Sequence, residues 1–168
     1  MEAAVGFDPE NNARSSEVAW IADKPDNTWI IDPIADLVAV TNRKHWQWDL
    51  TDREPLQYTC YGAEQFYGWH TDSRAKPYPT DGRWPGLTRK ISVTVTLSDA
   101  ADYDGGDFAI EDTTLPPSKI EKRIKRVDQA RTRGSVIIFA SHLHHEVQPV
   151  THGQRRSLVG WFLGPPFR

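Results

Sequence analysis

Apolar and polar residues alternate along several short segments, which is the pattern of β-strands that bury one face. The clearest case is the segment 89–98, where β-branched residues are frequent and favour an extended chain. Four apolar residues occupy one side and three hydroxyl-bearing residues the other: Ile91, Val93, Val95 and Leu97 against Ser92, Thr94 and Thr96. Similar patterns predict further strands at 15–23, 46–50, 56–61, 107–111, 120–127, 135–140, 145–150 and 155–163.

One segment near the N-terminus has a helical period instead. Asp32 is a suitable N-cap, and Pro33 after it would occupy the first helical position. The residues that share one side of this helix are Ile30, Ile34, Leu37, Val38 and Thr41. Many short strands with one N-terminal helix predict a mostly β fold, a jelly roll with the helix packed on the outside of a sheet.

Length, charge and cysteine content narrow the class of protein. The 168 residues suit a single domain spanning 1–168. A formal net charge of -3 lacks the positive field of a nucleic-acid binder, so we expect no nucleic-acid partner. No segment approaches the roughly 18 apolar residues of a membrane span, so we expect no membrane partner. The single cysteine, Cys60, agrees with a reducing compartment, and we expect a cytoplasmic protein.

The segment 73–88 contains three prolines and two glycines and has no period, which predicts a long loop of the size of a lid. Two of its aromatic residues, Tyr78 and Trp84, have two equally acceptable interpretations. They anchor the loop, or they form a platform for substrate on a lid.

Candidate metal ligands follow a short aromatic run. On a strand, His70 and Asp72 project from the same face, and the absent side chain of Gly68 leaves room beside them. Two histidines and one carboxylate that leave three coordination positions open suit non-haem ferrous iron. A second histidine is therefore required.

The candidates for the second histidine lie in the segment 139–162, which offers four: His142, His144, His145 and His152. If His145 begins a strand, a hairpin through 152–153 returns with four alternating residues on one side: Arg155, Ser157, Val159 and Trp161. An arginine with a neighbouring hydroxyl suits the distal carboxylate of 2-oxoglutarate bound to iron, because the guanidinium binds carboxylates with charge-assisted bidentate bonds.

HTD at 70–72 and HEVQPVTHGQRRSLVGW at 145–161 resemble the iron- and 2-oxoglutarate-dependent dioxygenases of the prolyl 4-hydroxylase type, including short phage and bacterial members. In that family a distal histidine follows the HxD motif, and a basic residue stands ten residues further on. His145 and Arg155 keep this interval. The resemblance covers roughly 57–161, including the aromatic segment 61–70 and the glycine pair at 105–106.

This resemblance implies a double-stranded β-helix that binds Fe(II), 2-oxoglutarate and dioxygen. The iron ligands it implies are His70, Asp72 and His145. The 2-oxoglutarate contacts it implies are Arg155 at the distal carboxylate with Ser157 and Thr96 assisting, and Tyr61 near the other end. In such a scheme the cofactor supplies the difficult chemistry, and the protein positions it against the substrate.

Three functions remain open at this point. The type of dioxygenase resembled implies hydroxylation of a prolyl residue in a peptide or protein, with release of succinate and CO2. A free amino acid or another small metabolite is the alternative substrate. A non-catalytic module that binds a metal or a carbohydrate is the third reading, and Arg155 argues against it because a plain metal site has no use for a carboxylate clamp.

Overall fold

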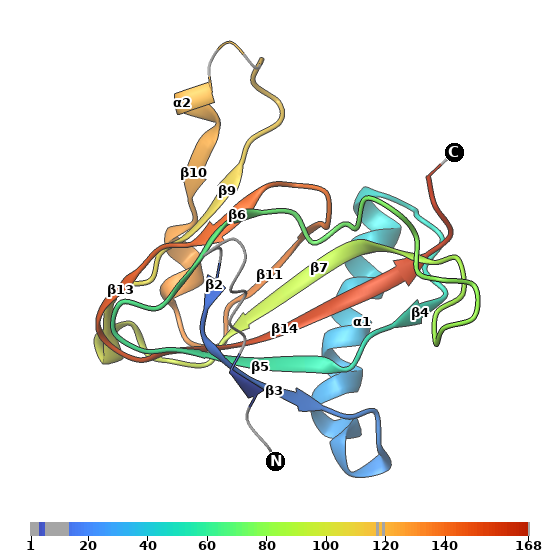
Figure 1. Ribbon diagram of the computed structural model, residues 1–168, viewed down its shortest axis with the longest axis horizontal. Coiled ribbons are helices and arrows are strands. Elements are labelled where there is room, and N and C mark those ends of the chain that lie inside the picture. Colours follow the sequence, from blue (N-terminus) through green and yellow to red (C-terminus); the bar gives the residue numbers. More distant parts are fainter. Residues whose placement is uncertain (1–3, 6–13, 117, 119, 168) are drawn as a thin grey trace.

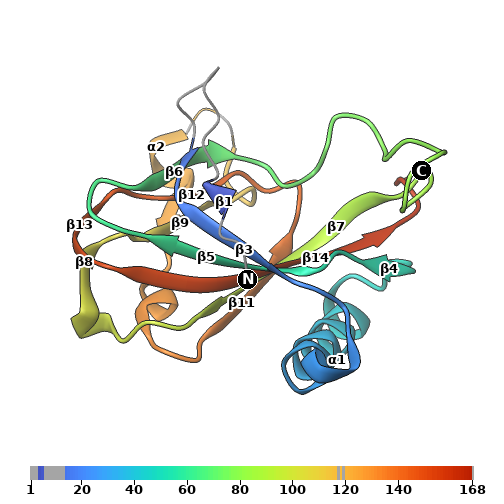
Figure 2. The ribbon, with the colours of Figure 1, turned by 60° about the horizontal axis from the view of Figure 1, so that its bottom comes forward.

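The computed structural model describes residues 4–5, 14–116, 118 and 120–167. Two antiparallel sheets face each other, and one long helix covers the outer face of the larger sheet (Figures 1 and 2). The larger sheet has the strand order β1-β3-β5-β14-β7-β11, with β4 paired to β14, and the smaller has the order β10-β9-β12-β6-β2. The prediction of a mostly β chain in a jelly-roll arrangement is confirmed.

The strands of the larger sheet are β1 (Ala4–Val5), β3 (Glu17–Ile21), β4 (Asp52–Arg53), β5 (Leu56–Tyr61), β7 (Thr88–Thr96), β11 (Val136–Ala140) and β14 (Arg155–Gly164). Those of the smaller sheet are β2 (Arg14–Ser15), β6 (Phe66–His70), β9 (Phe108–Glu111), β10 (Ile124–Arg126) and β12 (His145–Val147). A separate pair joins β8 (Tyr103–Gly105) and β13 (Val150–Gly153). The helices are α1 (Thr28–His45) and α2 (Ile120–Arg123).

The apolar faces of β5, β7 and β14 point toward α1. Because side chains alternate along a strand, the residues of these strands that meet the helix belong to one face. The buried members of this core are Ile31, Ile34 and Val38 from α1, with Leu56, Ile91, Val93, Leu158 and Phe162 from the sheet. The hydrophobic core between helix and sheet leaves the opposite face of the same strands for other contacts.

That opposite face is polar, buried, and turned toward the smaller sheet. Its residues include Ser92, Thr94 and Thr96 of β7 with Arg155 and Ser157 of β14, each at most 6% exposed. A second apolar cluster, which includes Tyr61, Phe108, Phe139 and Val147, surrounds this polar strip between the sheets. The hydroxyl-bearing side of the segment 89–98 therefore lies inside the molecule, and this arrangement creates the site.

The helix begins at Thr28, earlier than the predicted start at Asp32, and Pro33 lies inside it. A 3-10 turn at Pro25–Asn27 leads directly into the helix. The missing N–H of Pro33 would leave the carbonyl of Trp29 without its helical donor, and this turn is open to water, with Trp29 74% exposed. The buried side consists of Ile31, Ile34, Val38 and Asn42, so the predicted burial of Leu37 is wrong.

The predicted strand at 46–50 is absent from the structure, which places a turn and irregular chain there. The side chain of Asn42 takes the place of a neighbouring strand: its Oδ1 accepts from the Trp48 N–H at 3.0 Å and its Nδ2 donates to the Trp48 carbonyl at 2.8 Å. The rings of Trp46 and Trp48 stack at 5.4 Å. A side chain thus satisfies the backbone groups that would otherwise call for strand pairing.

Other predicted boundaries differ in detail. The segment 120–127 is helical in its first part and forms a strand only at β10, and β9 and β10 extend as an arm from the body (Figure 1). The pair of β8 with β13 was not predicted. Within the described residues, no helix combines the length and apolarity needed to cross a membrane.

The helix register is testable by a pair of truncations. Ile31→Ala removes a side chain that is 2% exposed and should lower the free energy of unfolding by about 2–5 kcal/mol, because a cavity remains in the core. Leu37→Ala, at a position that is 47% exposed, should cost less than about 1 kcal/mol. Urea unfolding of both variants measures the difference. Equal losses would contradict the orientation of α1.

Candidate metal centre and adjoining pocket

Two neighbouring strands of the smaller sheet place the candidate histidines. In the antiparallel pair of β12 with β6, His145 lies directly opposite His70. Asp72 follows just after β6 ends, rather than on the strand as predicted. The backbone N–H groups of Asp72 and Ser73 both donate to the carbonyl of Ser141 at 2.9 Å, which fixes the turn that carries the carboxylate.

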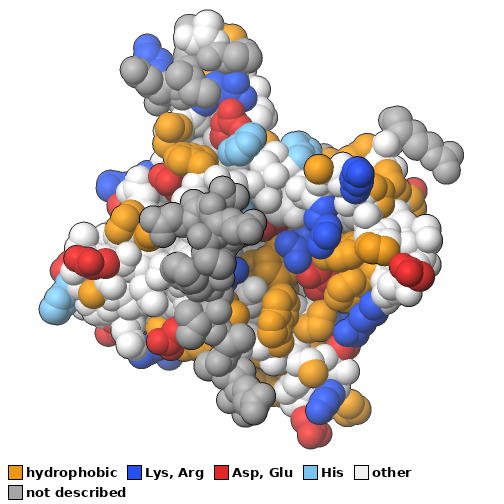
Figure 3. Space-filling model, viewed as in Figure 1, with side chains coloured by type: hydrophobic (Ala, Val, Ile, Leu, Met, Phe, Trp, Pro, Cys, Tyr) orange, Lys and Arg blue, Asp and Glu red, His pale blue; other side chains and the backbone are white. Residues whose placement is uncertain are grey.

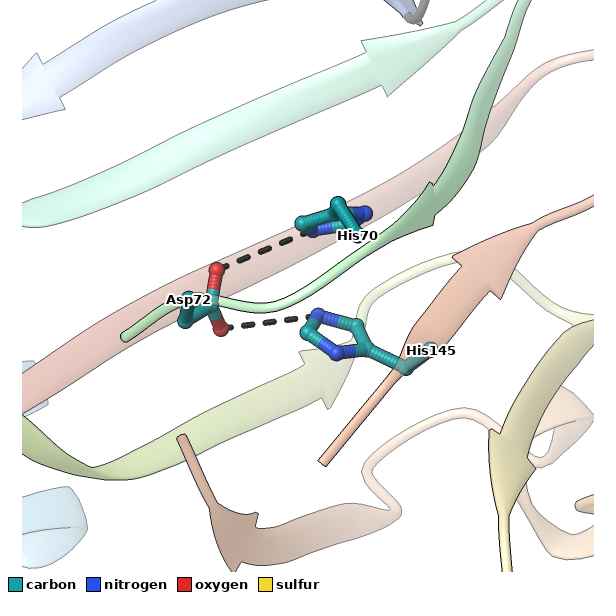
Figure 4. A group of neighbouring side chains, drawn as sticks. All are labelled: His70, Asp72 and His145. Carbon is teal, nitrogen blue, oxygen red and sulfur yellow. Dashed lines mark ion pairs between the residues drawn. The ribbon is translucent and has the colours of Figure 1, made fainter. Parts of the chain in front are cut away.

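The three side chains converge on one point (Figure 4). Their possible ligand atoms all lie within 4.8 Å of one another. Each carboxylate oxygen of Asp72 faces one ring: Oδ1 lies 3.7 Å from His70 Nε2, and Oδ2 lies 3.5 Å from His145 Nε2. An ion about 2.0–2.2 Å from each ligand atom separates neighbouring ligands by about 3 Å. The spacing therefore fits a metal ion with small adjustments.

Backbone carbonyls orient both imidazoles. His70 Nδ1 lies 2.8 Å from the Gly68 carbonyl oxygen, and His145 Nδ1 lies 3.0 Å from that of Leu143. When Nδ1 carries the proton and donates to a carbonyl, Nε2 keeps its lone pair for a metal. Both rings thus present Nε2 to the common centre.

The protonation states also suit a metal. Burial by itself would raise the pKa of Asp72, but the neighbouring rings of His70 and His145 and the Ser92 hydroxyl outweigh it and hold that pKa well below its usual range. Ser92 Oγ donates to Asp72 Oδ2 at 2.7 Å and also contacts Ser141 Oγ at 2.8 Å. Burial lowers the pKa of His145, which keeps the ring neutral. A carboxylate with neutral imidazoles is the form that binds metals.

The other histidines of the C-terminal segment lie elsewhere. His142 packs against Trp48, with ring centroids 6.2 Å apart, and His144 Nδ1 lies 3.1 Å from Glu111 Oε2 on the surface. His152 lies in β13 and is exposed. In the part of the chain that the structure describes, the metal-ligand cluster contains His145 and none of these three.

The metal centre opens into a pocket lined from both sheets. Arg155 and Ser157 of β14 line it, together with Tyr61 of β5. Arg155 is 1% exposed, its Nη1 donates to Ser157 Oγ at 3.3 Å, and its Nε has no protein partner among the described residues. Because a buried guanidinium without a carboxylate is costly, this arrangement fits a site that receives an anion.

The glycine pair at 105–106 closes over the stem of Arg155. Gly106 has a φ of 61°, and a Cβ built there would lie 3.1 Å from Arg155 Cδ and 2.9 Å from Val150 Cγ2. Only glycine combines this left-handed conformation with so close an approach. The turn thereby holds the guanidinium in place.

Thr96 is not where the prediction put it. It pairs with Ser157 across β7 and β14, yet its hydroxyl donates to the Ala130 carbonyl at 2.6 Å and it does not line the pocket. Thr94, two residues earlier on the same face, does line it. Of the two threonines, the one at the pocket is therefore Thr94.

Tyr78 and Trp84 do not line the pocket either. Their rings lie 5.2 Å apart, and Tyr78 Oη donates to Glu54 Oε1 at 2.6 Å. Glu54 is also held by Arg89, whose Nε and Nη2 donate to its two oxygens at 2.6 Å each. This network anchors the loop 73–88. Contact of Tyr78 or Trp84 with a substrate stays a prediction.

Several pocket residues were not predicted, and two kinds of signal explain the difference. Alternation along 89–98 could have identified Thr94, because it lies on the face opposite the apolar one. Residues from segments far apart in sequence carry no such signal. The unpredicted lining residues are Arg14, Gln57, Tyr67, Thr94, Phe108, Phe139 and Val147.

A model of the 2OG-Fe(II) oxygenase superfamily matches residues 56–163, which contain the whole metal centre and Arg155. The chain belongs to this superfamily. The predicted resemblance is thereby confirmed, and membership implies Fe(II), 2-oxoglutarate and dioxygen as cofactor and co-substrates.

Similar curated proteins are PKHD-type hydroxylases. One from Idiomarina loihiensis is 33% identical over 101 residues, which are 60% of this chain and 38% of that protein. One from Sphingopyxis alaskensis is 37% identical over 101 residues, covering 60% and 40%. The chain thus spans about two fifths of the length of these relatives.

Similar solved structures share the fold at lower identity. A prolyl-4-hydroxylase from Pseudomonas putida gives a TM-score of 0.64 at 22% identity, covering 92% of this chain and 75% of that one. A prolyl hydroxylase from Trichoplax adhaerens, in complex with a peptide fragment of the hypoxia inducible factor oxygen degradation domain, gives 0.67 at 20%, covering 95% and 70%. Both support the jelly-roll assignment of this oxygenase.

The ligand assignment is testable by replacing neighbouring histidines. His145→Ala should abolish stoichiometric binding of Co(II) or anaerobic Fe(II), because one of three ligands is lost, while His144→Ala should leave affinity within about threefold. Titration calorimetry measures both. If His144→Ala lost the metal and His145→Ala kept it, the ligand would be His144 and the assignment of His145 would be wrong.

Proposed function

We propose that this chain hydroxylates an unactivated C–H bond of a prolyl residue in a peptide or protein, with conversion of 2-oxoglutarate and dioxygen to succinate and CO2. The observation that carries the proposal is the meeting of two sites in one pocket. The set of His70, Asp72 and His145, of which Asp72 and His145 are buried, lines the same pocket as the buried guanidinium of Arg155. A metal centre beside a carboxylate receptor is what an iron-bound keto diacid requires.

The triad would hold Fe(II) and leave three positions open. When bound, the iron with its co-substrates supplies the oxidising chemistry for C–H hydroxylation. Arg155 and Ser157 would bind the distal carboxylate of 2-oxoglutarate with charge-assisted hydrogen bonds. The Gly106 turn packs against the stem of Arg155.

The remaining walls of the pocket include aromatic side chains. Phe108 and Phe139 pack beside His145, with ring centroids 5.8 Å and 4.7 Å from it. Burial raises the pKa of Tyr61, so that its phenol stays protonated and able to donate a hydrogen bond into the pocket. A dry site strengthens each electrostatic contact made within it.

A prolyl substrate is supported by the aromatic and apolar walls next to the metal centre. Tyr67, Val159 and Trp161 line the pocket and offer flat or apolar surfaces to a five-membered ring. On the face shown in Figure 3, hydrophobic side chains gather over β5, β14 and β7, with Lys and Arg side chains among them. The peptide seen with the Trichoplax enzyme supports a peptide as the substrate class.

A turnover screen tests the proposal. The chain, loaded anaerobically with Fe(II) and 2-oxoglutarate and then given oxygen, is offered a library of prolyl peptides and a panel of free amino acids. We expect succinate release coupled to a mass gain of one oxygen on prolyl peptides. Oxygen gain on free amino acids alone would contradict the peptide assignment, and no coupled succinate release would contradict the oxygenase activity.

Arg155 should affect 2-oxoglutarate far more than iron. Arg155→Ala should raise the KM for 2-oxoglutarate by about tenfold to a hundredfold, because charge-assisted bonds are lost, while Fe(II) affinity changes less than about threefold. Arg156→Ala is the matched control. Arg156 lies on the face of β14 opposite Arg155, and its side chain donates a hydrogen bond to Gln154. Steady-state kinetics and metal titration measure the two effects. Equal losses of iron and 2-oxoglutarate affinity would refute the role of Arg155.

A further inference from the structure

A second arginine, Arg14, also lines the pocket of the metal centre. It reaches the pocket from β2, the edge strand of the smaller sheet, where it lies opposite Tyr67 of β6. Residues directly opposite each other in an antiparallel pair place their side chains on the same face. The guanidinium accordingly follows Tyr67 into the space between the sheets.

A β-bulge brings Tyr67 against a metal ligand. The pairing of β6 with β12 shifts register, because His70 faces His145 while Tyr67 faces Val147. The extra residue in β6 turns Tyr67 and His70 to the same face. Their rings stack with centroids 3.5 Å apart and an interplanar angle of 13°.

Arg14 is fixed on this stack. Its Cζ lies 4.7 Å from the centre of the Tyr67 ring, a cation–π contact. Its Nε donates to Ser16 Oγ at 2.7 Å, and Ser16 is fully buried. One edge of the guanidinium is thereby committed to the protein, and no described carboxylate forms an ion pair with the remaining Nη groups.

The charges of the pocket explain what Arg14 can bind. The two positive charges of Fe(II) and that of Arg155 are offset by the charge of Asp72 and the two of 2-oxoglutarate. Arg14 then remains as one uncompensated positive charge on the wall, since Asp72 is the only carboxylate among the described lining residues. A partly buried cation next to a neutral centre favours an anion.

The two arginines differ in depth. Arg155 is 1% exposed, whereas Arg14 is only partly buried. The deeper guanidinium suits the co-substrate, which stays between the sheets. The shallower one is open to contact with a substrate that enters the pocket from outside.

We propose that Arg14 binds a carboxylate of the primary substrate, so that this enzyme selects substrates with an acidic group near the C–H bond attacked. This inference rests on the proposed function for the reaction but concerns a separate contact. The carboxylate comes from an acidic residue next to the proline of a peptide, or from the free carboxyl of an amino acid. Both present the planar acceptor that a guanidinium fork matches.

Binding without turnover tests the contact directly. Protein loaded with Mn(II) and 2-oxoglutarate under anaerobic conditions is titrated with matched probes: peptides with Pro-Asp or Asp-Pro against their Asn counterparts, and L-proline against L-prolinamide. The wild-type chain should bind the acid at least about tenfold more tightly than the amide in one of these arms. The arm that shows the preference identifies the source of the carboxylate.

Variants assign that preference to Arg14. Arg14→Gln should reduce the ratio of acid to amide affinity to within about twofold of unity, while Arg14→Lys should keep part of it because the charge remains. Arg133→Gln removes the same charge at the surface, where Arg133 pairs with Asp99 at 3.1 Å, and should leave the ratio unchanged. Thermal unfolding checks that each variant is folded.

Two results would overturn the inference. One is a wild-type chain that binds the acidic probes no more tightly than the amide probes, for the peptides and for proline alike, or that binds no probe at all. The other is an Arg14→Gln variant that is folded and keeps the full preference. A carboxylate preference that depends on Arg14 in a chain that releases no succinate would instead refute the proposed reaction and leave the binding site standing.

Discussion

The pairing of β6 with β12 is the constraint on which the site depends. It puts His70 directly opposite His145 and brings their ring centroids to 4.2 Å. Each ring has its Nδ1 held by a backbone carbonyl, so both Nε2 atoms are acceptors and the rings do not hydrogen-bond to each other through them. Both Nε2 atoms are instead suited to bind a cation. Asp72 completes the set because the Ser141 carbonyl fixes the turn after β6. A metal centre thus follows from strand register.

Buried polar groups between the two sheets surround the metal centre. Folding places an arginine, an aspartate and several hydroxyl groups in an interior where unpaired polar atoms are costly. Most find partners within the protein, as Ser92 does with Asp72. Arg155 Nε and Trp161 Nε1, both beside the pocket, are buried without a hydrogen-bond partner in the described residues. Such donors are expected where a ligand is received.

Much of this site could be predicted because it depends on local patterns. Alternation identified β5, β7 and β14 and put Arg155, Ser157 and Trp161 on one face, which all line the pocket. The resemblance to the dioxygenase family, in which a basic residue follows the distal histidine by ten residues, selected His145 among four histidines, and the structure places it with His70 and Asp72.

The errors arose where tertiary contacts override local pattern. Asn42 satisfies the backbone of Trp48, so a segment with strand-like residues does not pair. The bulge in β6 and the docking of β2 join Arg14, Tyr67 and His70, which no periodicity connects. The Thr96 hydroxyl donates to the carbonyl of Ala130, in a distant turn, whereas Thr94 lines the pocket.

The most direct measurement is an anaerobic titration followed by visible absorption. Fe(II) and 2-oxoglutarate together should produce a charge-transfer band in the wild-type chain, which neither gives alone. The band should be lost in Asp72→Ala and should require much more 2-oxoglutarate in Arg155→Ala. A featureless spectrum from wild-type protein shown to contain iron and 2-oxoglutarate would contradict a chelate held between the triad and Arg155.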